Sequence, residues 1–445
     1  MPVDATTEAV ISAGPRGLPL LGSIPHFARD PLAFFERLRG HGDLVQWRLG
    51  PRRAIFLSRP EHIGELLAGV ETDYRHPELG WAFTLLLGNG VVVSEGADWR
   101  RKRALVQPAV RPRQVRTYAT VMAECAEAVA DRWKPGDRVD LRREMHGLTQ
   151  RIAVRTLFGA ETVGREAVIG DAMDVAQREI GAEFRGITLF LPPWVTTPGR
   201  RRLRAAVAVV DEEIARVTAA RRASGERDDL LSRLLAARDE KGVPLTDREI
   251  RDEAVTLYVG GHETTATTLT WAWYLLSRNP QARERLSAEL RTVLGGRTPG
   301  FDDVRQLRWT EQIVRETLRL YPTIWLMTAR AKDGSTIAGH PVAEDTVLWC
   351  SQWSAHRDER WFPEPGAFRP ERWAEDAGTP VPDHAWFPFG GGPRACLGAR
   401  FATVEAVLVL ATLAQRFRLD IDPGEIRPKP GLTLQQDRAV MATVA

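Results

Sequence analysis

The sequence predicts a mainly α-helical fold with a small β-rich lobe, and two observations carry this prediction. The first is apolar helical periodicity, which runs from Trp99 to about Arg222 and again over 247–278. The later stretch is about thirty residues long, so at about 1.5 Å per residue its helix should cross a whole domain. The second observation is a pair of short apolar runs at 43–49 and 53–58, joined by a Gly-Pro turn, which predict a β-hairpin.

The remaining elements follow from the same patterns. Further helices are expected at 31–40, 60–68, 228–238, 281–294, 309–321 and directly after Cys396. The long helical region should break near 134–136 and 191–199, where proline and glycine interrupt it. Short strands are expected within 324–350. Irregular chain is expected at 15–25, 74–97 and 357–386.

Composition and charge narrow the class of protein. The 445 residues carry a formal net charge of +3, which is small for this length and gives no indication of nucleic-acid binding. We expect a single domain over 1–445, with residues 1–14 disordered. The three cysteines are odd in number and far apart, so no disulfide framework is predicted. The N-terminal segment has no apolar run long enough to span a bilayer and no signal-peptide pattern, which indicates a cytoplasmic protein.

A cysteine in a Gly/Pro-rich loop is the most informative local feature. The stretch 389–398, FGGGPRACLG, precedes an amphipathic run that predicts a helix. A thiol at a helix N-terminus meets unpaired N–H groups and the positive end of the helix dipole, which favours the metal-ligating thiolate. The glycines at 391, 392 and 398 should let the backbone approach a bulky flat cofactor. A lone cysteine is otherwise most often a small buried apolar residue.

The predicted helix over 247–278 contains a second unusual stretch, GGHETT at 260–265. Two glycines in mid-helix cost about 1 kcal/mol each relative to alanine, so they indicate close approach of a ligand or a local widening. Glu263 followed by Thr264 supplies an acid and an alcohol for a proton route. Thr264 can also bond its own backbone carbonyl and distort the helix. A notch for packing another helix is the alternative reading.

Two further pairs of residues share a helix face. Glu316 and Arg319 have i, i+3 spacing in an apolar surrounding, which predicts a partly buried ion pair. On an exposed face such a pair would contribute less than about 1 kcal/mol. Trp99 and Arg103 are one turn apart, so an indole N–H and a guanidinium can both donate to one carboxylate.

Two other sites match fragments of the sequence and are rejected. The pair His262-Glu263 begins the zinc pattern H-E-x-x-H, but Ala266 stands where the second histidine is required. The stretch 390–395 formally fits the dinucleotide pattern G-x-G-x-x-A. A proline interrupts it, however, and the residues before it are a poor parallel strand.

Together the four motifs resemble the cytochrome P-450 superfamily of haem-thiolate monooxygenases, in the family's order and over roughly 14–440. The matched residues are Trp99 and Arg103, the stretch 260–265, Glu316 and Arg319 with Arg372 of a Pro-Glu-Arg segment, and Phe389, Gly392, Arg394, Cys396 and Gly398. The resemblance implies one triangular, mainly helical domain. Haem b, iron protoporphyrin IX, would lie between the 247–278 helix and the helix after Cys396.

The resemblance also implies roles for individual residues. Cys396 would be the axial ligand of the haem iron, Glu263 would relay protons, and Thr264 would hold dioxygen and water. The implied haem contacts are Trp99, Arg103, Arg330, Phe389, Arg394 and Gly398, with the arginines on the propionates. Glu316, Arg319 and Arg372 would form a structural lock behind the haem loop.

By the same resemblance, the substrate pocket should be apolar. Its expected contacts are Phe83, Leu87, Phe184, Tyr258, Gly261, Ile324 and Leu326. None of them is charged, so we expect a hydrophobic substrate. The Glu-Thr-Thr motif and the apolar contacts resemble those of bacterial enzymes that act on terpenoids or lipids, which implies a sesquiterpene-type terpenoid first and a fatty acid second.

We expect a monomer that uses O2 and receives electrons from a ferredoxin with its reductase, or from a flavodoxin. Arg101, Lys102 and Arg400 are candidate contacts for that donor, with ordinary solvated charge as the alternative. A peroxide-dependent peroxygenase of the same fold, or a non-catalytic haem sensor or electron carrier, are the other functions considered. The acid–alcohol pair Glu263-Thr264 argues against both.

Overall fold

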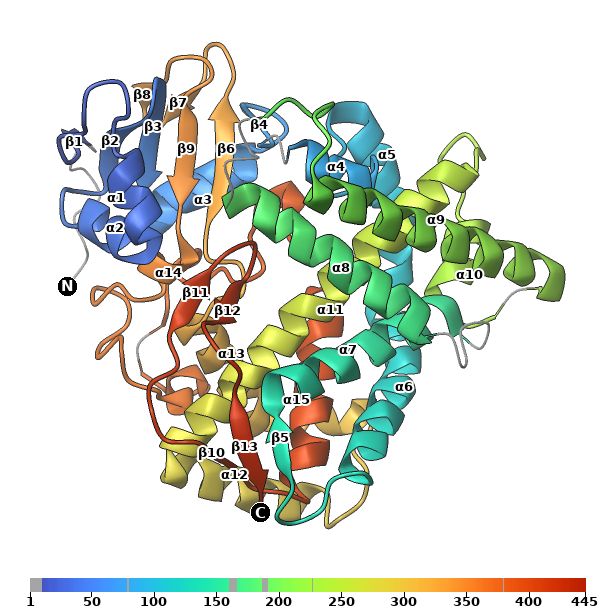
Figure 1. Ribbon diagram of the computed structural model, residues 1–445. Helices are drawn as coiled ribbons and strands as arrows, with labels where there is room; N and C mark the ends of the chain where they lie inside the picture. The colour runs from blue at the N-terminus through green and yellow to red at the C-terminus, as the bar shows by residue number, and fades with distance from the viewer. Residues whose placement is uncertain (1–9, 78–79, 160–165, 186–190, 226, 379) are drawn as a thin grey trace. The chain divides into compact units, whose positions relative to one another are not determined.

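The computed structural model describes residues 10–77, 80–159, 166–185, 191–225, 227–378 and 380–445 (Figure 1). The chain divides into two compact units. The first contains residues up to Pro77, Arg315–Cys396 and Thr433–Gln435, and the second contains Glu78–Val314, Leu397–Leu432 and Gln436–Ala445. The largest sheet belongs to the first unit and most of the long helices to the second.

The first unit is built on a six-stranded sheet with the strand order β1-β2-β3-β9-β6-β4. Its strands are β1 (Ile11–Ala13), β2 (Leu44–Leu49), β3 (Arg52–Leu57), β4 (Tyr74–Arg75), β6 (Met327–Ala331) and β9 (Val347–Cys350). β2 and β3 form the predicted antiparallel hairpin, with Leu44 opposite Leu57. β3 also pairs in parallel with β9, which joins the early and late parts of the chain. A separate short pair consists of β7 (Thr336–Ile337) and β8 (His340–Pro341).

Helices pack on both faces of this sheet because its strands are apolar on both sides. The helices of the unit are α1 (Ile24–Arg29), α2 (Pro31–Arg39), α3 (Pro60–Gly69) and α14 (Gln352–Ala355). Phe34 and Phe35 of α2 pack with Trp47, Phe56 and Trp349 in one buried cluster. Residues of α3 pack in a second cluster with Leu44, Ile55, Leu57 and Leu348. These strand residues alternate with those of the first cluster, so the two clusters lie on opposite faces of the sheet.

The second unit is mostly helical. Its helices are α4 (Trp81–Leu87), α5 (Gly96–Val106), α6 (Pro112–Ala130), α7 (Leu141–Phe158), α8 (Glu166–Arg185), α9 (Pro198–Ser224), α10 (Leu230–Ala236), α11 (Asp247–Arg278), α12 (Pro280–Val293) and α15 (Ala399–Ala414). Helix α13 (Arg308–Leu320) contains the division between the units. A three-stranded antiparallel sheet has the order β10-β13-β5, from Leu419–Ile421, Met441–Val444 and Arg138–Asp140. Strand β11 (Pro428–Pro430) also belongs to this unit, whereas the first two residues of β12 (Leu434–Gln436) belong to the first unit.

Helix α11 has the bounds that its periodicity predicts, and it packs against α7 and α15 (Figure 1, yellow). A capping box begins it. The N–H of Glu249 donates to the Thr246 hydroxyl at 3.2 Å, and the N–H of Thr246 donates to the Glu249 carboxylate at 2.8 Å. This reciprocal cap satisfies two donors that the first turn would otherwise leave unpaired, which explains why the start of α11 could be read from the sequence.

Two expectations about local structure are wrong. Residues 74–97 contain β4 and α4 and are not irregular throughout. The seven residues of α4, WAFTLLL, are apolar almost all round, so they show no helical period, and neither end has a side-chain cap. Residues 1–14 were expected to be disordered, but Ile11–Ala13 form β1, paired in parallel with β2. Residues 1–9 lie outside the described residues.

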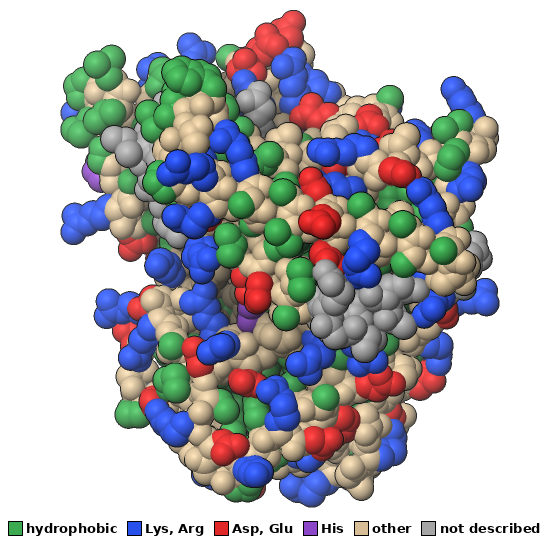
Figure 2. Space-filling model, turned by 45° about the vertical axis from the view of Figure 1, so that its right-hand side comes forward, with side chains coloured by type: hydrophobic (Ala, Val, Ile, Leu, Met, Phe, Trp, Pro, Cys, Tyr) green, Lys and Arg blue, Asp and Glu red, His purple; other side chains and the backbone are tan. Residues whose placement is uncertain are grey.

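Charged side chains of both signs are interspersed over the visible face in Figure 2, in keeping with the small net charge. None of the helices in the described part of the chain combines the length and apolarity needed to cross a bilayer.

Candidate active site

The cysteine loop places Cys396 at the surface, just before α15. The Cys396 N–H donates to the carbonyl of Phe389 at 2.9 Å, which closes the loop. A short 3-10 turn over Gly392–Arg394 lies inside it. Gly398 occupies the N-cap position of α15, so the cysteine lies two residues before the N-cap and faces the positive end of the helix dipole.

The glycine at 392 lets the cysteine loop lie directly against α3. Its φ is +62°, and a Cβ there would lie 2.1 Å from the backbone oxygen of Leu67 in α3. A Cβ added at Gly391 would lie 3.0 Å from the Cδ1 atom of Leu67. These glycines therefore let the loop pack tightly on α3.

Two of the three arginines expected on haem propionates, Arg394 and Arg330, hold protein carboxylates. Arg394 donates from Nε to Glu71 Oε1 at 2.8 Å, and both side chains are buried. Arg330, in β6, donates to Asp345 at 2.9 Å. A propionate would be an additional partner for each guanidinium, which has five N–H donors. His76 lies near Arg394; burial, and then the charge of Arg394, lowers the pKa of His76 to about 4, so it is neutral at pH 7.

Glu316 and Arg319 form a fully buried ion pair, and Arg372 joins it. Arg319 donates to both carboxylate oxygens of Glu316, at 2.8 and 2.9 Å, and neither side chain is exposed. Arg372 donates to the same carboxylate at 3.1 Å. Glu316 also accepts from the backbone N–H of Arg369 and the indole N–H of Trp373. The carboxylate thus has many donors, as a buried charge requires.

This network is connected to the cysteine loop by a short chain of hydrogen bonds. Arg319 donates to the backbone carbonyl of His356 at 2.9 Å. The His356 ring in turn accepts from the N–H of Phe387 at 2.9 Å, two residues before the loop begins. Burial, and then the charges of Arg319 and Arg357, keep the pKa of His356 well below its ordinary value, so the ring is neutral and can accept this bond.

The glycine stretch of α11 leaves one face of the helix open. A Cβ at Gly260 or Gly261 would meet nothing within 4 Å outside the helix's own backbone. On this face the Thr264 hydroxyl donates to the Gly260 carbonyl at 2.7 Å, as the sequence suggested. Glu263, the residue before Thr264, is buried.

Trp99 and Arg103 lie on α5, where the tryptophan is buried and the arginine partly exposed. The residues beside them do not offer a docking surface. Lys102 is only 2% exposed and donates to the carbonyl of Asn89 and the carboxylate of Asp98. Arg101 is ion-paired with two carboxylates. The expectation that Lys102 contacts an electron donor is therefore wrong.

The expected substrate contacts fall in different environments. Phe83 and Leu87 are buried on α4, while Ile324 and Leu326 are partly buried and Leu326 packs against the aromatic cluster of the sheet. Tyr258 is fully buried, and its ring lies 5.3 Å from that of His262. At 100° per residue Tyr258 points away from Gly260, and its role as a substrate contact stays a prediction. The side chain of Phe184 lies outside the described residues.

Two acids of α11 that the sequence did not single out hold the segment before α5. Asp252 accepts from the N–H of Asn89 at 2.9 Å, and Glu253 accepts from the N–H of Val91 at 3.1 Å. Burial is the main reason that the pKa of Glu253 is raised to about 7. No sequence pattern links these acids to residues 89–91, because the partners are more than 160 positions apart.

These residues fit a haem bound through cysteine. All three cysteines are described, and only Cys396 is exposed. Burial raises the pKa of the Cys350 thiol to about 12 and also raises the pKa of Cys125. Cys396, exposed before a helix N-terminus, is thus the cysteine suited to act as a thiolate ligand. The open face of α11 at Gly260 and Gly261 is the kind of surface that a flat ligand can approach.

The fold and the cysteine loop together are those of a haem-thiolate protein. A family model described as Cytochrome P450 matches residues 13–441. The chain belongs to this family and is a cytochrome P450 monooxygenase with haem as its cofactor. Members of the family normally require an electron-transfer partner and O2. The predicted family, fold class and cofactor are confirmed, whereas the roles of individual site residues stay predictions.

Curated relatives cover nearly the whole chain. Cyclooctatin synthase of Streptomyces melanosporofaciens is 38% identical over 95% of this chain and 93% of its own. Cyclooctat-9-en-7-ol 5-monooxygenase of the same organism is 36% identical, over 94% and 90%. Pentalenene oxygenase of Streptomyces avermitilis is 35% identical, over 96% of both chains. A solved structure of retinoic acid bound cyanobacterial CYP120A1 has a TM-score of 0.85 at 24% identity, over 99% of this chain and 100% of that chain, and shows the same fold.

Breaking the buried ion pair should lower the free energy of unfolding far more than breaking a surface pair. We expect Arg319→Met to lower the free energy of unfolding by about 3–5 kcal/mol, because it leaves Glu316 buried without its bidentate partner. Urea titration followed by circular dichroism measures this change. Arg369→Met is the matched control, since its pairs with Glu364 and Glu371 are exposed and should contribute less than about 1 kcal/mol. Equal losses in the two variants would contradict the structural role of Arg319.

Glu253 should make stability depend on pH. Its pKa of about 7 in the folded state lies above its ordinary value of 4.5, so folding favours the protonated form. The free energy of unfolding that comes from this preference is fully present below about pH 4.5. It falls by roughly 3 kcal/mol in total as pH rises toward 7. Glu253→Gln keeps an acceptor for Val91 but cannot titrate. The stability difference, wild type minus variant, should therefore fall between pH 5 and 7 in urea titrations.

Glu249→Gln is the control for this pH dependence. The hydrogen bonds of Glu249 with Thr246 and Arg101 outweigh its desolvation and lower its pKa. The contribution of Glu249 is therefore constant above its ordinary pKa and is lost only as pH falls below it. A difference that stays flat between pH 5 and 7 for Glu253→Gln would show that Glu253 titrates normally.

Proposed function

We propose that this cytochrome P450 inserts one oxygen atom from O2 into a C–H bond of a terpenoid, with electrons from a ferredoxin and its reductase or from a flavodoxin. The observation that carries the proposal is the position of Cys396, exposed and two residues before the N-cap of α15. The other two cysteines are buried, which makes them poor thiolates.

Cys396 would hold the haem iron, and Trp99, Arg103, Arg330, Phe389, Arg394 and Gly398 would contact the rest of the group. Bound haem supplies the binding and reductive activation of O2. Arg394 and Arg330 are already fixed by Glu71 and Asp345, so neither arginine must be ordered when a propionate binds. Such preorganisation lowers the entropic cost of holding an anionic group.

Protons would reach the oxygen through Glu263 and Thr264. The Thr264 hydroxyl donates its hydrogen to the Gly260 carbonyl, so the hydroxyl oxygen remains available as an acceptor on the open side of α11. It can therefore accept a hydrogen bond from a water molecule beside it. The Glu263 carboxyl lies next to it in the chain and is buried, where it can exchange a proton with solvent by a change of rotamer.

The substrate class rests on the apolar candidate contacts and on the relatives. Phe83, Leu87 and Ile324 carry no polar side-chain atom, so the surface that they offer favours a hydrocarbon skeleton over a charged molecule. Relatives named for pentalenene and for cyclooctat-9-en-7-ol support a terpenoid, since these names describe a hydrocarbon and a mono-alcohol. A fatty acid is less well supported, because none of the expected contacts is cationic.

For the electron donor, Arg400 is the remaining candidate contact. It is exposed in the first turn of α15, four residues after Cys396, and its guanidinium lies 5.6 Å from the ring of Phe301. An exposed cation so close to the cysteine in sequence suits an acidic partner such as a ferredoxin or flavodoxin.

Removing the Thr264 hydroxyl should separate electron use from product formation. We expect the Thr264→Ala variant to consume electrons from the reductase system at a rate similar to the wild type, but to release peroxide or water in place of most of the product. Parallel assays of electron consumption, peroxide and product measure the coupling. Thr270→Ala is the matched control, because Thr270 makes the same bond to the carbonyl four residues earlier but is buried on another face. Unchanged coupling in Thr264→Ala would remove Thr264 from this role.

A ligand screen should identify the substrate class. We expect terpenes to shift the haem absorption band of the wild type from low to high spin more strongly than fatty acids, steroids or macrolides do. The Cys396→Ser variant should lose the red-shifted ferrous–CO band that thiolate ligation produces. Retention of that band would contradict the assignment of Cys396. A shift with fatty acids alone would leave the ligand assignment intact and overturn the terpenoid proposal.

A further inference from the structure

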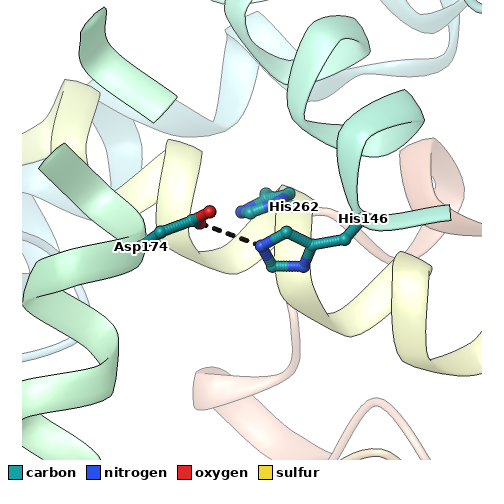
Figure 3. A group of neighbouring side chains, drawn as sticks. All are labelled: His146, Asp174 and His262. Carbon is teal, nitrogen blue, oxygen red and sulfur yellow. Dashed lines mark hydrogen bonds and ion pairs between the residues drawn. The ribbon is translucent and has the colours of Figure 1, made fainter. Parts of the chain in front are cut away.

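Three helices of the second unit bring together two histidines and an aspartate, apart from the cysteine loop. His146 comes from α7, Asp174 from α8 and His262 from α11 (Figure 3). The His146 Nε2 atom lies 2.9 Å from Asp174 Oδ1, and the two imidazole rings are 4.0 Å apart between centroids. One ligand atom from each of the three residues lies within 4.8 Å of the other two.

His262 is the unusual member of this cluster. It is fully buried, and neither of its ring nitrogens makes a hydrogen bond of ordinary geometry, although the backbone of His146 lies near the ring. Buried polar atoms in folded proteins are almost always paired, so two unpaired nitrogens on one ring indicate a missing partner.

The cluster is open to solvent on one side. The side chains of His146 and Asp174 are 31% and 39% exposed, whereas His262 lies beneath them. A cation can thus reach the three residues from solvent, and a water molecule can complete its coordination. A purely structural histidine pair would not need an exposed carboxylate beside it.

We propose that His146, Asp174 and His262 bind one zinc ion. Two imidazole nitrogens and one carboxylate oxygen, with water in the fourth position, form an open tetrahedral site that zinc accepts. Ligand atoms about 2.0–2.2 Å from a shared ion lie within roughly 4 Å of one another, so the three side chains must close slightly from their present separation. The Asp174 carboxylate and the His146 ring would then both bind the ion in place of the hydrogen bond between them.

This zinc site is independent of the haem assignment. His262 and Thr264 are two residues apart on α11, so their side chains point in directions that differ by roughly 160° around the helix axis. The metal would join α7 and α8 to α11 on the packed side, while the open side at Gly260 stays accessible. The site has no overlap with the rejected H-E-x-x-H pattern, because its second histidine and its carboxylate come from two other helices.

Metal counting on the haem-loaded enzyme, produced without a histidine tag, tests the proposal. After equilibrium dialysis against low micromolar Zn²⁺, mass spectrometry of the metals should give one zinc per haem iron in the wild type. His262→Gln and His146→Gln should each weaken zinc binding about tenfold or more. His26→Gln, at an exposed histidine on α1, is the matched control and should bind zinc like the wild type. The thermal midpoint of the wild type should rise with Zn²⁺, and that of His146→Gln should not.

Zinc well below one equivalent in the wild type, or equal binding by His146→Gln, would overturn the proposal. If His262→Gln does not fold, as judged by circular dichroism, then His146→Gln and Asp174→Asn decide the question, because both positions are partly exposed. Loss of zinc from these two variants supports the site, and retention in both refutes it.

Discussion

The first unit depends on one buried charge. Glu316 has no solvent contact, and removing a carboxylate from water is costly unless donors surround it. Arg319 contributes two such donors, and its other N–H groups donate to backbone carbonyls, including those of Pro365 and Ala367. The described part of the chain at 357–386 forms turns and one short 3-10 helix, Pro370–Trp373. The ion pair therefore fixes this chain as its anchor, because Arg319 and Glu316 bond to its backbone.

This fixed point matters for the chemistry because it is continuous with the cysteine loop. Arg319 holds the backbone of His356, whose ring holds Phe387 just before the loop. Gly392 then lets the loop sit on α3 with no side chain between them. Cys396 is exposed, yet the chain just before it is held in place at Phe387 and at Gly392. A metal-binding thiolate requires this combination, since a mobile loop would hold the iron poorly.

Side chains with two different kinds of chemistry lie on two different faces of helix α11. Its open face carries Gly260 and the Thr264 hydroxyl, while its packed face carries His262 and Tyr258 among α7 and α8. The same six-residue stretch thus contributes an accessible surface and a buried imidazole. The rule of 3.6 residues per turn permits this, because neighbours in sequence point to different sides. Haem chemistry gives no role to the buried His262 side chain.

The sequence by itself determined what is local. The bounds of α11, the β2–β3 hairpin, the Glu316–Arg319 spacing and the cysteine loop all depend on contacts within a few residues, and each was predicted. Only the tertiary structure decided which distant residues complete them. Glu71 pairs with Arg394 across 323 positions, and Asp252 holds Asn89 across 163. It also decided that Lys102 is buried and that His146 and Asp174 meet His262. Such pairs leave no periodic signal, because their geometry arises from how helices and strands pack and not from spacing along the chain.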